Sequence, residues 1–150
     1  MYSIRKCTKE DLDQILTLSE NWANEGITIG YENVKHTKSK LENRLNNYFY
    51  IALYGNEEVV GYTFGDIRKG NAGPVISEDE EYLEIFEVYI KPDHRKKGIG
   101  KKLIEHILKA AESNNIKRSL VGSSNQAWNK TAEFLFTARL SGGEQTVFRH

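Results

Sequence analysis

The sequence predicts an α+β fold, in which a mixed, mostly antiparallel central sheet is flanked by helices on both faces. Two observations lead to this prediction. The β-rich segments 48–54 and 59–67 are separated by a short turn, "GNEE", and therefore indicate an antiparallel hairpin. A strand over 82–90, a long amphipathic helix and a short strand within 114–122 then form a β-α-β unit, whose two strands run parallel. A sheet with both kinds of pair is mixed, and its connecting helices pack on its two faces.

The first third of the chain predicts one strand and two helices. Residues 2–5 can form a short strand, and "TKED" matches a capping box with Thr8 as N-cap and Asp11 as its partner. The next helix has an inner face at helical spacing and ends at Gly26. A weaker helix is predicted within residues 37–47. The inner face of the first helix comprises Leu12, Ile15, Leu16, Ser19 and Trp22.

The rest of the chain predicts two more helices and a final strand. Pro92 stops the strand over 82–90, and a glycine-bearing turn then opens a long helix. A further helix is predicted over 130–140, and the last residues, "EQTVFRH", are enough for one strand. The buried face of the long helix comprises Ile99, Leu103, Ile104, Ile107, Leu108 and Ala111.

Length and composition predict one soluble, cytoplasmic domain over residues 1–150. Lys plus Arg and Asp plus Glu are both 21, and this balance argues against a general nucleic-acid binder. Cys7 is the single cysteine, so an intrachain disulfide is excluded, and the four histidines lack metal-ligand spacing. No apolar run reaches the ~18 residues of a membrane span, and the first residues do not resemble a signal peptide. We therefore expect no metal, no membrane and no nucleic acid.

The stretch "RKKGIGKKL", which begins at Arg95, predicts an anion-binding site. Gly98 and Gly100 permit a tight turn at the N-terminus of a helix, where unpaired N–H groups and the helix dipole favour a phosphate. A nucleotide P-loop is excluded, because the glycines have the wrong spacing and no Ser or Thr follows the lysine. A dinucleotide fingerprint fails as well, since Leu103 stands where a third glycine or alanine is needed.

A strand, a proline and then R-x-x-G-x-G at the start of a long amphipathic helix resemble the acetyl-coenzyme A loop of the GNAT superfamily of N-acetyltransferases. Arg95, Gly98 and Gly100 occupy the three defining positions. The resemblance extends from "IRKCTKEDLDQI" through the central hairpin and "EVYIKPDHRKKGIGKKLI" to about residue 136. It implies the acyl-CoA N-acyltransferase fold, with acetyl-CoA as the co-substrate.

The resemblance also implies which residues bind the coenzyme. The loop amides would hold the pyrophosphate, with charge from Arg95 and the lysines, and the strand before the loop would pair with the pantetheine arm. A bulge near Val88 or Tyr89 would aim an N–H at the thioester carbonyl, as an oxyanion hole does. Asn129, with Asn125 as the alternative, would contact the coenzyme arm. The predicted binding residues are Val88, Tyr89, Ile90, Arg95, Lys96, Lys97, Gly98, Ile99, Gly100, Lys101 and Asn129.

Two glutamates are candidates for the catalytic base that deprotonates the acceptor amine. Glu84 aligns with the strand glutamate of the histone-acetylating branch, and Glu87 matches an acidic residue of many small-molecule members. In a regular strand the two side chains point to opposite faces, so only one could face the cleft unless a bulge intervenes. Glu87 could equally bind a cationic substrate.

The sequence departs from the family pattern in two places. Members commonly carry a tyrosine that protonates the departing thiolate, and Phe136 stands at that position. Members also continue with two further strands after the last helix, whereas only ten residues remain here, which implies a shortened C-terminal end. An exposed sheet edge favours pairing with a second copy, so we predict a homodimer.

The resemblance leads to two functional hypotheses. The first is an enzyme that transfers the acetyl group of acetyl-CoA to a primary amine by direct attack in a ternary complex. The acceptor would be a small-molecule amine, or the lysine or N-terminal amine of a protein. The second is a non-catalytic acetyl-CoA-binding module or sensor, which Phe136 and the short C-terminal end favour.

Overall fold

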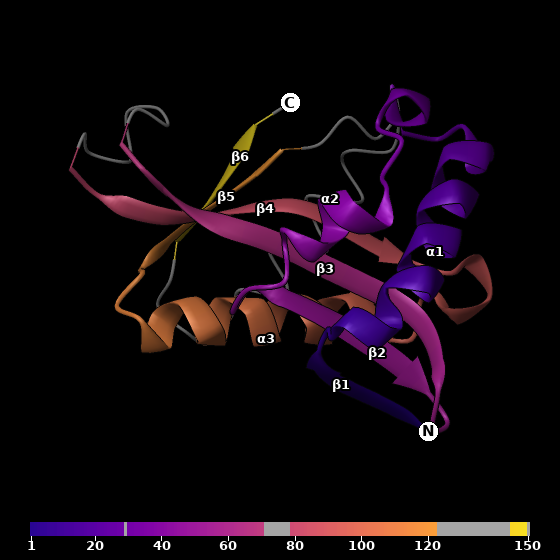
Figure 1. Ribbon diagram of the computed structural model, residues 1–150. Coiled ribbons are helices and arrows are strands. Elements are labelled where there is room, and N and C mark those ends of the chain that lie inside the picture. The colour runs from indigo at the N-terminus through magenta and orange to yellow at the C-terminus, as the bar shows by residue number, and fades with distance from the viewer. Residues whose placement is uncertain (29, 71–78, 123–144, 150) are drawn as a thin grey trace.

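The computed structural model describes residues 1–28, 30–70, 79–122 and 145–149. These residues form a six-stranded sheet with the order β1-β2-β3-β4-β5-β6 (Figure 1). Strands β1 to β4 pair antiparallel, β5 runs parallel to β4, and β6 runs parallel to β5. The predicted mixed, mostly antiparallel sheet is thus confirmed. The strands are β1 (Tyr2–Lys6), β2 (Phe49–Tyr54), β3 (Glu58–Lys69), β4 (Glu81–Ile90), β5 (Arg118–Gly122) and β6 (Gln145–Arg149).

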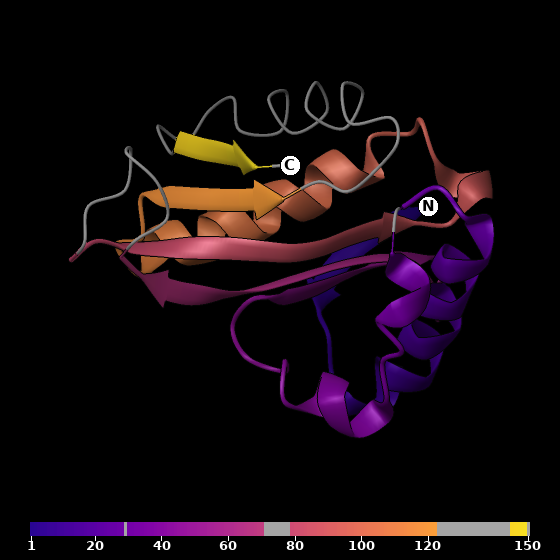
Figure 2. The same ribbon diagram turned by 90° about the horizontal axis from the view of Figure 1, so that it is seen from above.

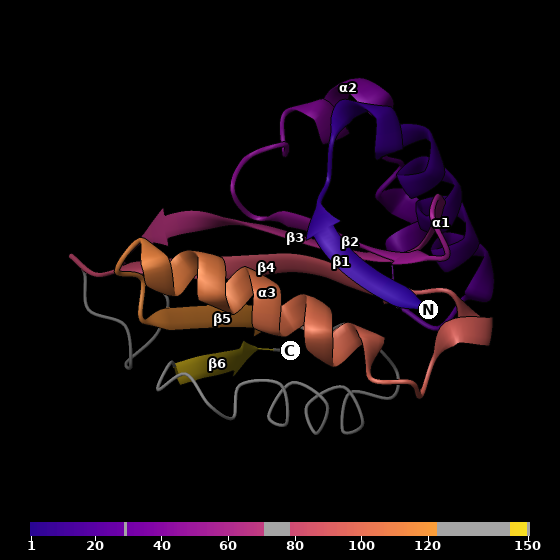
Figure 3. The ribbon, with the colours of Figure 1, turned by 90° about the horizontal axis from the view of Figure 1, so that it is seen from below.

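Helices cover both faces of the sheet, as predicted. Figures 2 and 3 show α1 and α2 on one face and α3 on the other. Two apolar clusters fill the layers, one between α3 and the sheet and the other between α1, α2 and the sheet. None of these helices combines the length and apolarity that spanning a lipid bilayer requires. The helices are α1 (Leu12–Glu25), α2 (Lys38–Glu42) and α3 (Ile99–Ser113), with short 3-10 turns η1 (Lys9–Asp11), η2 (Tyr31–Asn33) and η3 (Pro92–His94).

The capping box predicted before α1 is present. The Thr8 N–H donates to Asp11 Oδ2 at 2.8 Å, and the Asp11 N–H donates to the Thr8 carbonyl at 3.0 Å. The guanidinium of Arg5 adds two hydrogen bonds to the Asp11 carboxylate, at 2.7 and 2.9 Å. Burial alone would raise the pKa of Asp11, but the hydrogen bonds from Arg5 and Thr8 outweigh burial and hold that pKa below its ordinary value.

Replacing Asp11 by asparagine is expected to lower the free energy of unfolding by ~1–2 kcal/mol at pH 7. A carboxyl whose pKa is depressed on folding stabilises the protein fully above its unfolded pKa of ~4, and this stabilisation is lost as the pH falls through the folded pKa. Urea unfolding of both proteins at pH 7 and pH 3 measures the effect, with Asp13→Asn as the exposed control. The difference should shrink at pH 3; an equal difference at both pH values would contradict this account.

A β-bulge interrupts β4 where it pairs with β3. Phe64 lies opposite Glu87 and Gly65 lies opposite Ile85, so Phe86 is an extra residue in β4. The predicted bulge near Val88 or Tyr89 therefore occurs earlier in the strand. The physical reason is Gly65, where an added Cβ would lie 2.2 Å from the carbonyl oxygen of Glu84. Only glycine allows the two backbones to approach this closely.

The bulge changes which side chains share a face of the sheet. Ile85 packs in the layer under α3, whereas Phe86 and Tyr89 pack in the layer under α1 and α2. By alternation on either side of the extra residue, Glu84 and Glu87 both belong to the α1 face. The structure therefore confirms the second alternative, in which a bulge brings both acids to one face.

The C-terminal part of the chain is described only in part. The helix predicted over 130–140 lies outside the described residues, as do Asn125, Asn129 and Phe136. The single strand predicted from "EQTVFRH" is confirmed as β6, which pairs with β5. Strands β1 and β6 form the two edges of the described sheet.

Candidate active site

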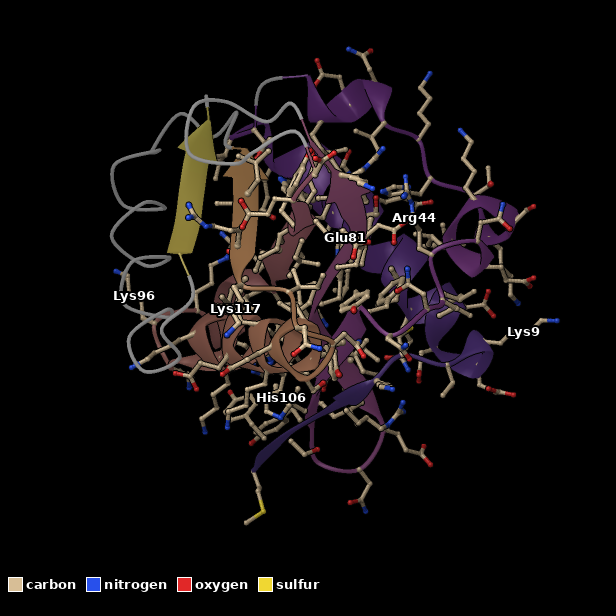
Figure 4. The ribbon with its side chains drawn as sticks, turned by 90° about the vertical axis from the view of Figure 1, so that its left-hand side faces the viewer. Lys9, Arg44, Glu81, Lys96, His106 and Lys117 are labelled. Atoms are coloured by element: carbon tan, nitrogen blue, oxygen red, sulfur yellow. The ribbon has the colours of Figure 1, made fainter. Side chains whose placement is uncertain are left out.

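The loop between β4 and α3 has the geometry of an anion site. Lys96 has a φ of +63° and Gly98 a φ of +78°, so the chain reverses sharply just before the helix begins at Ile99. The Gly98 carbonyl accepts the first intrahelical bond, from the Lys102 N–H at 3.2 Å. The N–H groups of the first turn have no partner within the helix. Lys96 is exposed and lies at the periphery of the molecule (Figure 4).

The end of β4 offers backbone groups on the side away from β3. The Lys91 N–H donates to the Val60 carbonyl of β3 at 2.8 Å. Because successive residues of a strand alternate, the N–H groups of Val88 and Ile90 point away from β3, toward the side of β5. Within the described ranges β5 pairs with β4 only at Leu83, Glu84 and Ile85, so this stretch of β4 has no neighbouring strand there. The backbone of Tyr89, by contrast, points toward β3.

Arg95, the first residue of the motif, points back toward α1. Its Nη2 lies 2.8 Å from Glu25 Oε1, and its Nε donates to the Ile90 carbonyl at 2.8 Å. The same guanidinium lies over the ring of Tyr89, whose hydroxyl also donates to Glu25. The Arg95 side chain therefore ties the loop to the end of α1, and its contact with a phosphate remains a prediction.

Replacing Glu25 by glutamine is expected to weaken acetyl-CoA binding ~3- to 10-fold. The change removes the ionic partner of Arg95. An ion pair that is partly exposed and holds a loop in its bound form contributes ~1 kcal/mol to the free energy of binding. Calorimetric titration measures the dissociation constant, with Glu20→Gln as the control because Glu20 is exposed on the same helix. Unchanged or tighter binding by the Glu25 variant would show that the ion pair does not preorganise the loop.

Glu87 lies in a buried polar cluster beneath α1. It is 9% exposed, and its Oε1 accepts hydrogen bonds from the Tyr31 and Tyr62 hydroxyls, both at 2.8 Å. Its Oε2 lies 2.6 Å from His36 Nε2, and the Ser19 hydroxyl lies 2.8 Å from the Tyr31 hydroxyl. No spacing pattern in the sequence indicates this cluster, because its members come from α1, the α1–α2 connection, β3 and β4.

The two tyrosines remain hydrogen-bond donors at neutral pH. Burial raises the pKa of Tyr31, and the negative charge of Glu87 raises it further. The same causes raise the pKa of Tyr62, which is fully buried. Trp22 fixes the position of Tyr31, since the two rings stack with centroids 4.0 Å apart. The carboxylate therefore has two permanent donors on one oxygen.

Glu84 has a different environment. Its Oε1 lies 3.5 Å from Arg68 Nε, and its side chain is 19% exposed. Arg68 also lies over the ring of Phe86, 5.2 Å from the centroid. The structure thus brings Glu87 into the buried cluster and Glu84 into a pair with an exposed arginine, although both acids share one face.

Other chemistry has little support in the described part of the chain. Burial raises the pKa of the Cys7 thiol to about 12, so the thiol is not a nucleophile at neutral pH. The described residues contain no group of three or more His, Cys, Asp or Glu side chains that could hold a metal ion.

Comparisons with known proteins bear on the family and the fold of this chain. Residues 10–137 match the sequence pattern of the Acetyltransferase (GNAT) family. An aminoglycoside acetyltransferase from an uncultured soil metagenomic sample is 17% identical, with a TM-score of 0.69 over 99% of this chain and 94% of that chain. A predicted acetyltransferase from Clostridium acetobutylicum, solved with acetyl-CoA, is 18% identical, with a TM-score of 0.65 over 88% of each chain.

A transcriptional regulator from Bacillus halodurans C-125 has the same fold, with 15% identity and a TM-score of 0.68 over 100% of this chain and 99% of that chain. At such identities the likeness establishes the fold alone. The family match covers most of the sequence and includes the loop, β4 and Glu87. The chain belongs to the GNAT family of acetyltransferases.

Proposed function

We propose that the protein is an N-acetyltransferase that transfers the acetyl group of acetyl-CoA to a primary amine by direct attack in a ternary complex. The observation that carries this proposal is the exposed loop at the N-terminus of α3, which lies close in sequence to the end of β4, a stretch that pairs with no strand on its β5 side among the described residues. Glu87, which the buried cluster surrounds, directly precedes this stretch of β4. The proposed coenzyme site and Glu87 therefore lie on one continuous segment of the chain.

The residues present fit the coenzyme. The amides of Lys96, Lys97, Gly98, Ile99, Gly100 and Lys101 would bind the pyrophosphate. This group is favoured at a helix N-terminus, and the lysines would add positive charge. The N–H groups of Val88 and Ile90 would pair with the pantetheine arm. The Val88 N–H would also stabilise the negative charge that develops on the thioester oxygen.

The chemistry requires a base but not a special leaving group. A primary amine is protonated at neutral pH and must lose a proton before it can attack. The coenzyme thiol has an ordinary pKa of ~8.5, so its thiolate can leave near neutrality even without a dedicated acid. Of the two glutamates, Glu87 is the one that is supported by a buried proton-transfer network.

The acceptor class is also a proposal: a small-molecule amine, or a lysine or N-terminal amine of a protein. The soil aminoglycoside acetyltransferase, which was also solved with sisomicin, makes aminoglycosides the first probes. A non-catalytic acetyl-CoA sensor is the second candidate, and the likeness to the Bacillus halodurans regulator favours it. We also propose that the protein forms a homodimer, which light scattering after size-exclusion chromatography tests.

Thiol release separates the two candidates. Purified protein is incubated with acetyl-CoA and, in turn, sisomicin, spermidine and a lysine-containing peptide. Free coenzyme A and acetylated product are then measured by thiol titration and mass spectrometry. An acetylated amine supports the enzyme. Tight binding of acetyl-CoA without any acetylated amine would favour the sensor.

A further inference from the structure

We propose that His36 is the residue that takes the proton from the acceptor amine, and that Glu87 is a positioning residue that orients the His36 imidazole. This proposal rests on the proposed acetyltransferase function and deepens it. Its starting point is the His36 Nε2 to Glu87 Oε2 distance of 2.6 Å. No sequence pattern connects these two residues, which are 51 positions apart.

Three donors already contact the Glu87 carboxylate. Tyr31 and Tyr62 donate to Oε1, and Oε2 is occupied by His36. An ionised carboxylate only accepts hydrogen bonds, so Nε2 of His36 must carry a proton and donate it to Glu87. An incoming amine has poor access to the one acceptor position left on Oε2, since the exposed fraction of Glu87 is only 9%.

The other nitrogen of His36 is available. Nδ1 has no hydrogen-bond partner among the residues that the structure describes, where the only polar contact of the ring is the one to Glu87. The His36 side chain is 13% exposed. With Nε2 protonated, Nδ1 has a lone pair and can accept a proton.

The surroundings hold the ring in this orientation. Lys35, just before His36, has a φ of +46°, a conformation that is uncommon for a residue other than glycine. The His36 ring packs edge-on against Phe64 and Tyr31, with centroids 5.8 and 6.4 Å apart. The titratable or charged groups around the ring are the Glu87 carboxylate, the Tyr31 hydroxyl and, beyond Phe64, the guanidinium of Arg44.

The proton balance of the reaction follows from this arrangement. The ammonium group gives one proton to Nδ1, and the resulting imidazolium is stabilised by the Glu87 carboxylate before it releases the proton to solvent. The free amine attacks the thioester carbon, so a C–N bond forms while the carbonyl oxygen becomes negative. As the intermediate collapses, the C–S bond breaks. The second proton leaves the nitrogen and ends on the departing coenzyme sulfur.

The test compares wild-type protein with His36→Ala and His36→Gln in the thiol-release assay, with sisomicin, spermidine and the lysine-containing peptide as acceptor probes. His106→Ala is the matched control, because His106 is exposed on α3 and contacts only the backbone of Lys102 and the ring of Tyr50. Acetyl-CoA binding, measured by calorimetry, reports whether each variant keeps its coenzyme site.

The expected result is a kcat lowered ~10²–10⁴-fold in both His36 variants, with unchanged acetyl-CoA binding. Added imidazole should raise the rate of His36→Ala at least ~tenfold. A variant that retains the wild-type rate overturns the proposal while the proposed function stands. The proposal is also overturned if His36→Ala is slow and imidazole does not restore its rate, while His36→Gln keeps the wild-type rate. A wild-type protein that acetylates none of the probes overturns both.

Discussion

Replacing Glu87 by glutamine is expected to lower kcat for acetyl transfer ~10²–10⁴-fold and to leave the dissociation constant of acetyl-CoA unchanged. Glutamine keeps the shape of the side chain, and its carbonyl can still accept from Tyr31 and Tyr62. Its amide group would then face His36 and donate to Nε2. This forces the other imidazole tautomer, in which Nδ1 carries the hydrogen and cannot accept a proton. Steady-state kinetics and calorimetry with both proteins measure the two quantities.

Glu84→Gln is the matched control for this prediction. Glu84 lies on the same face of β4 but pairs with Arg68, whereas Glu87 contacts the tyrosines and His36. We expect its kcat to stay within ~threefold of the wild type, which corresponds to less than ~0.7 kcal/mol of transition-state stabilisation. A large loss in Glu84→Gln together with full activity in Glu87→Gln would move the proton acceptor to Glu84.

Replacing Gly65 by alanine is expected to lower the free energy of unfolding by ~2–4 kcal/mol. The added Cβ would lie 2.2 Å from the Glu84 carbonyl oxygen and 3.1 Å from the Ile85 Cα, both of which are backbone atoms of β4. Backbone atoms cannot rotate away as the end of a side chain can, so the two strands must separate or the bulge must move. Urea unfolding measures the loss of stability.

Gly55→Ala provides the control for the glycine substitution. Gly55 has a φ of +67°, and a Cβ there would meet nothing within 4 Å, so the change adds backbone strain without a clash. Its expected cost is ~1 kcal/mol. Equal costs at the two positions would show that the β3–β4 contact is not the constraint that the structure indicates. A folded Gly65 variant should also lose activity, because a shift of the bulge displaces Glu87.

The sequence could predict most of the fold because the relevant signals are local. The hairpin, the β-α-β unit and the helix after Gly98 each follow from periodicity and turn residues within one segment. The capping box before α1 is likewise a pattern over four residues, and the structure has it at Thr8 and Asp11. The order of the strands in the sheet then follows from their connections.

The site could be predicted only in part because its decisive contacts are distant in sequence. The bulge is at Phe86 and not at Val88, since Gly65 on the neighbouring strand sets the register. The resemblance to the GNAT superfamily identified both candidate glutamates, but strand periodicity alone could not place them on one face. The cluster around Glu87 joins residues 19, 31, 36 and 62, and no spacing rule connects them.

The central claim, that the loop before α3 binds acetyl-CoA, is tested most directly by calorimetric titration of the wild-type protein and Gly100→Glu with acetyl-CoA. Gly100 lies in the first turn of α3, where a carboxylate would repel the pyrophosphate and occupy its place. Lys109→Glu, at an exposed position of the same helix, is the charge control, and thermal unfolding reports on the fold of each variant. We predict micromolar binding by the wild-type protein and the control, and none by Gly100→Glu. An absence of binding by the wild-type protein, or equal binding by a folded Gly100→Glu variant, would contradict the account.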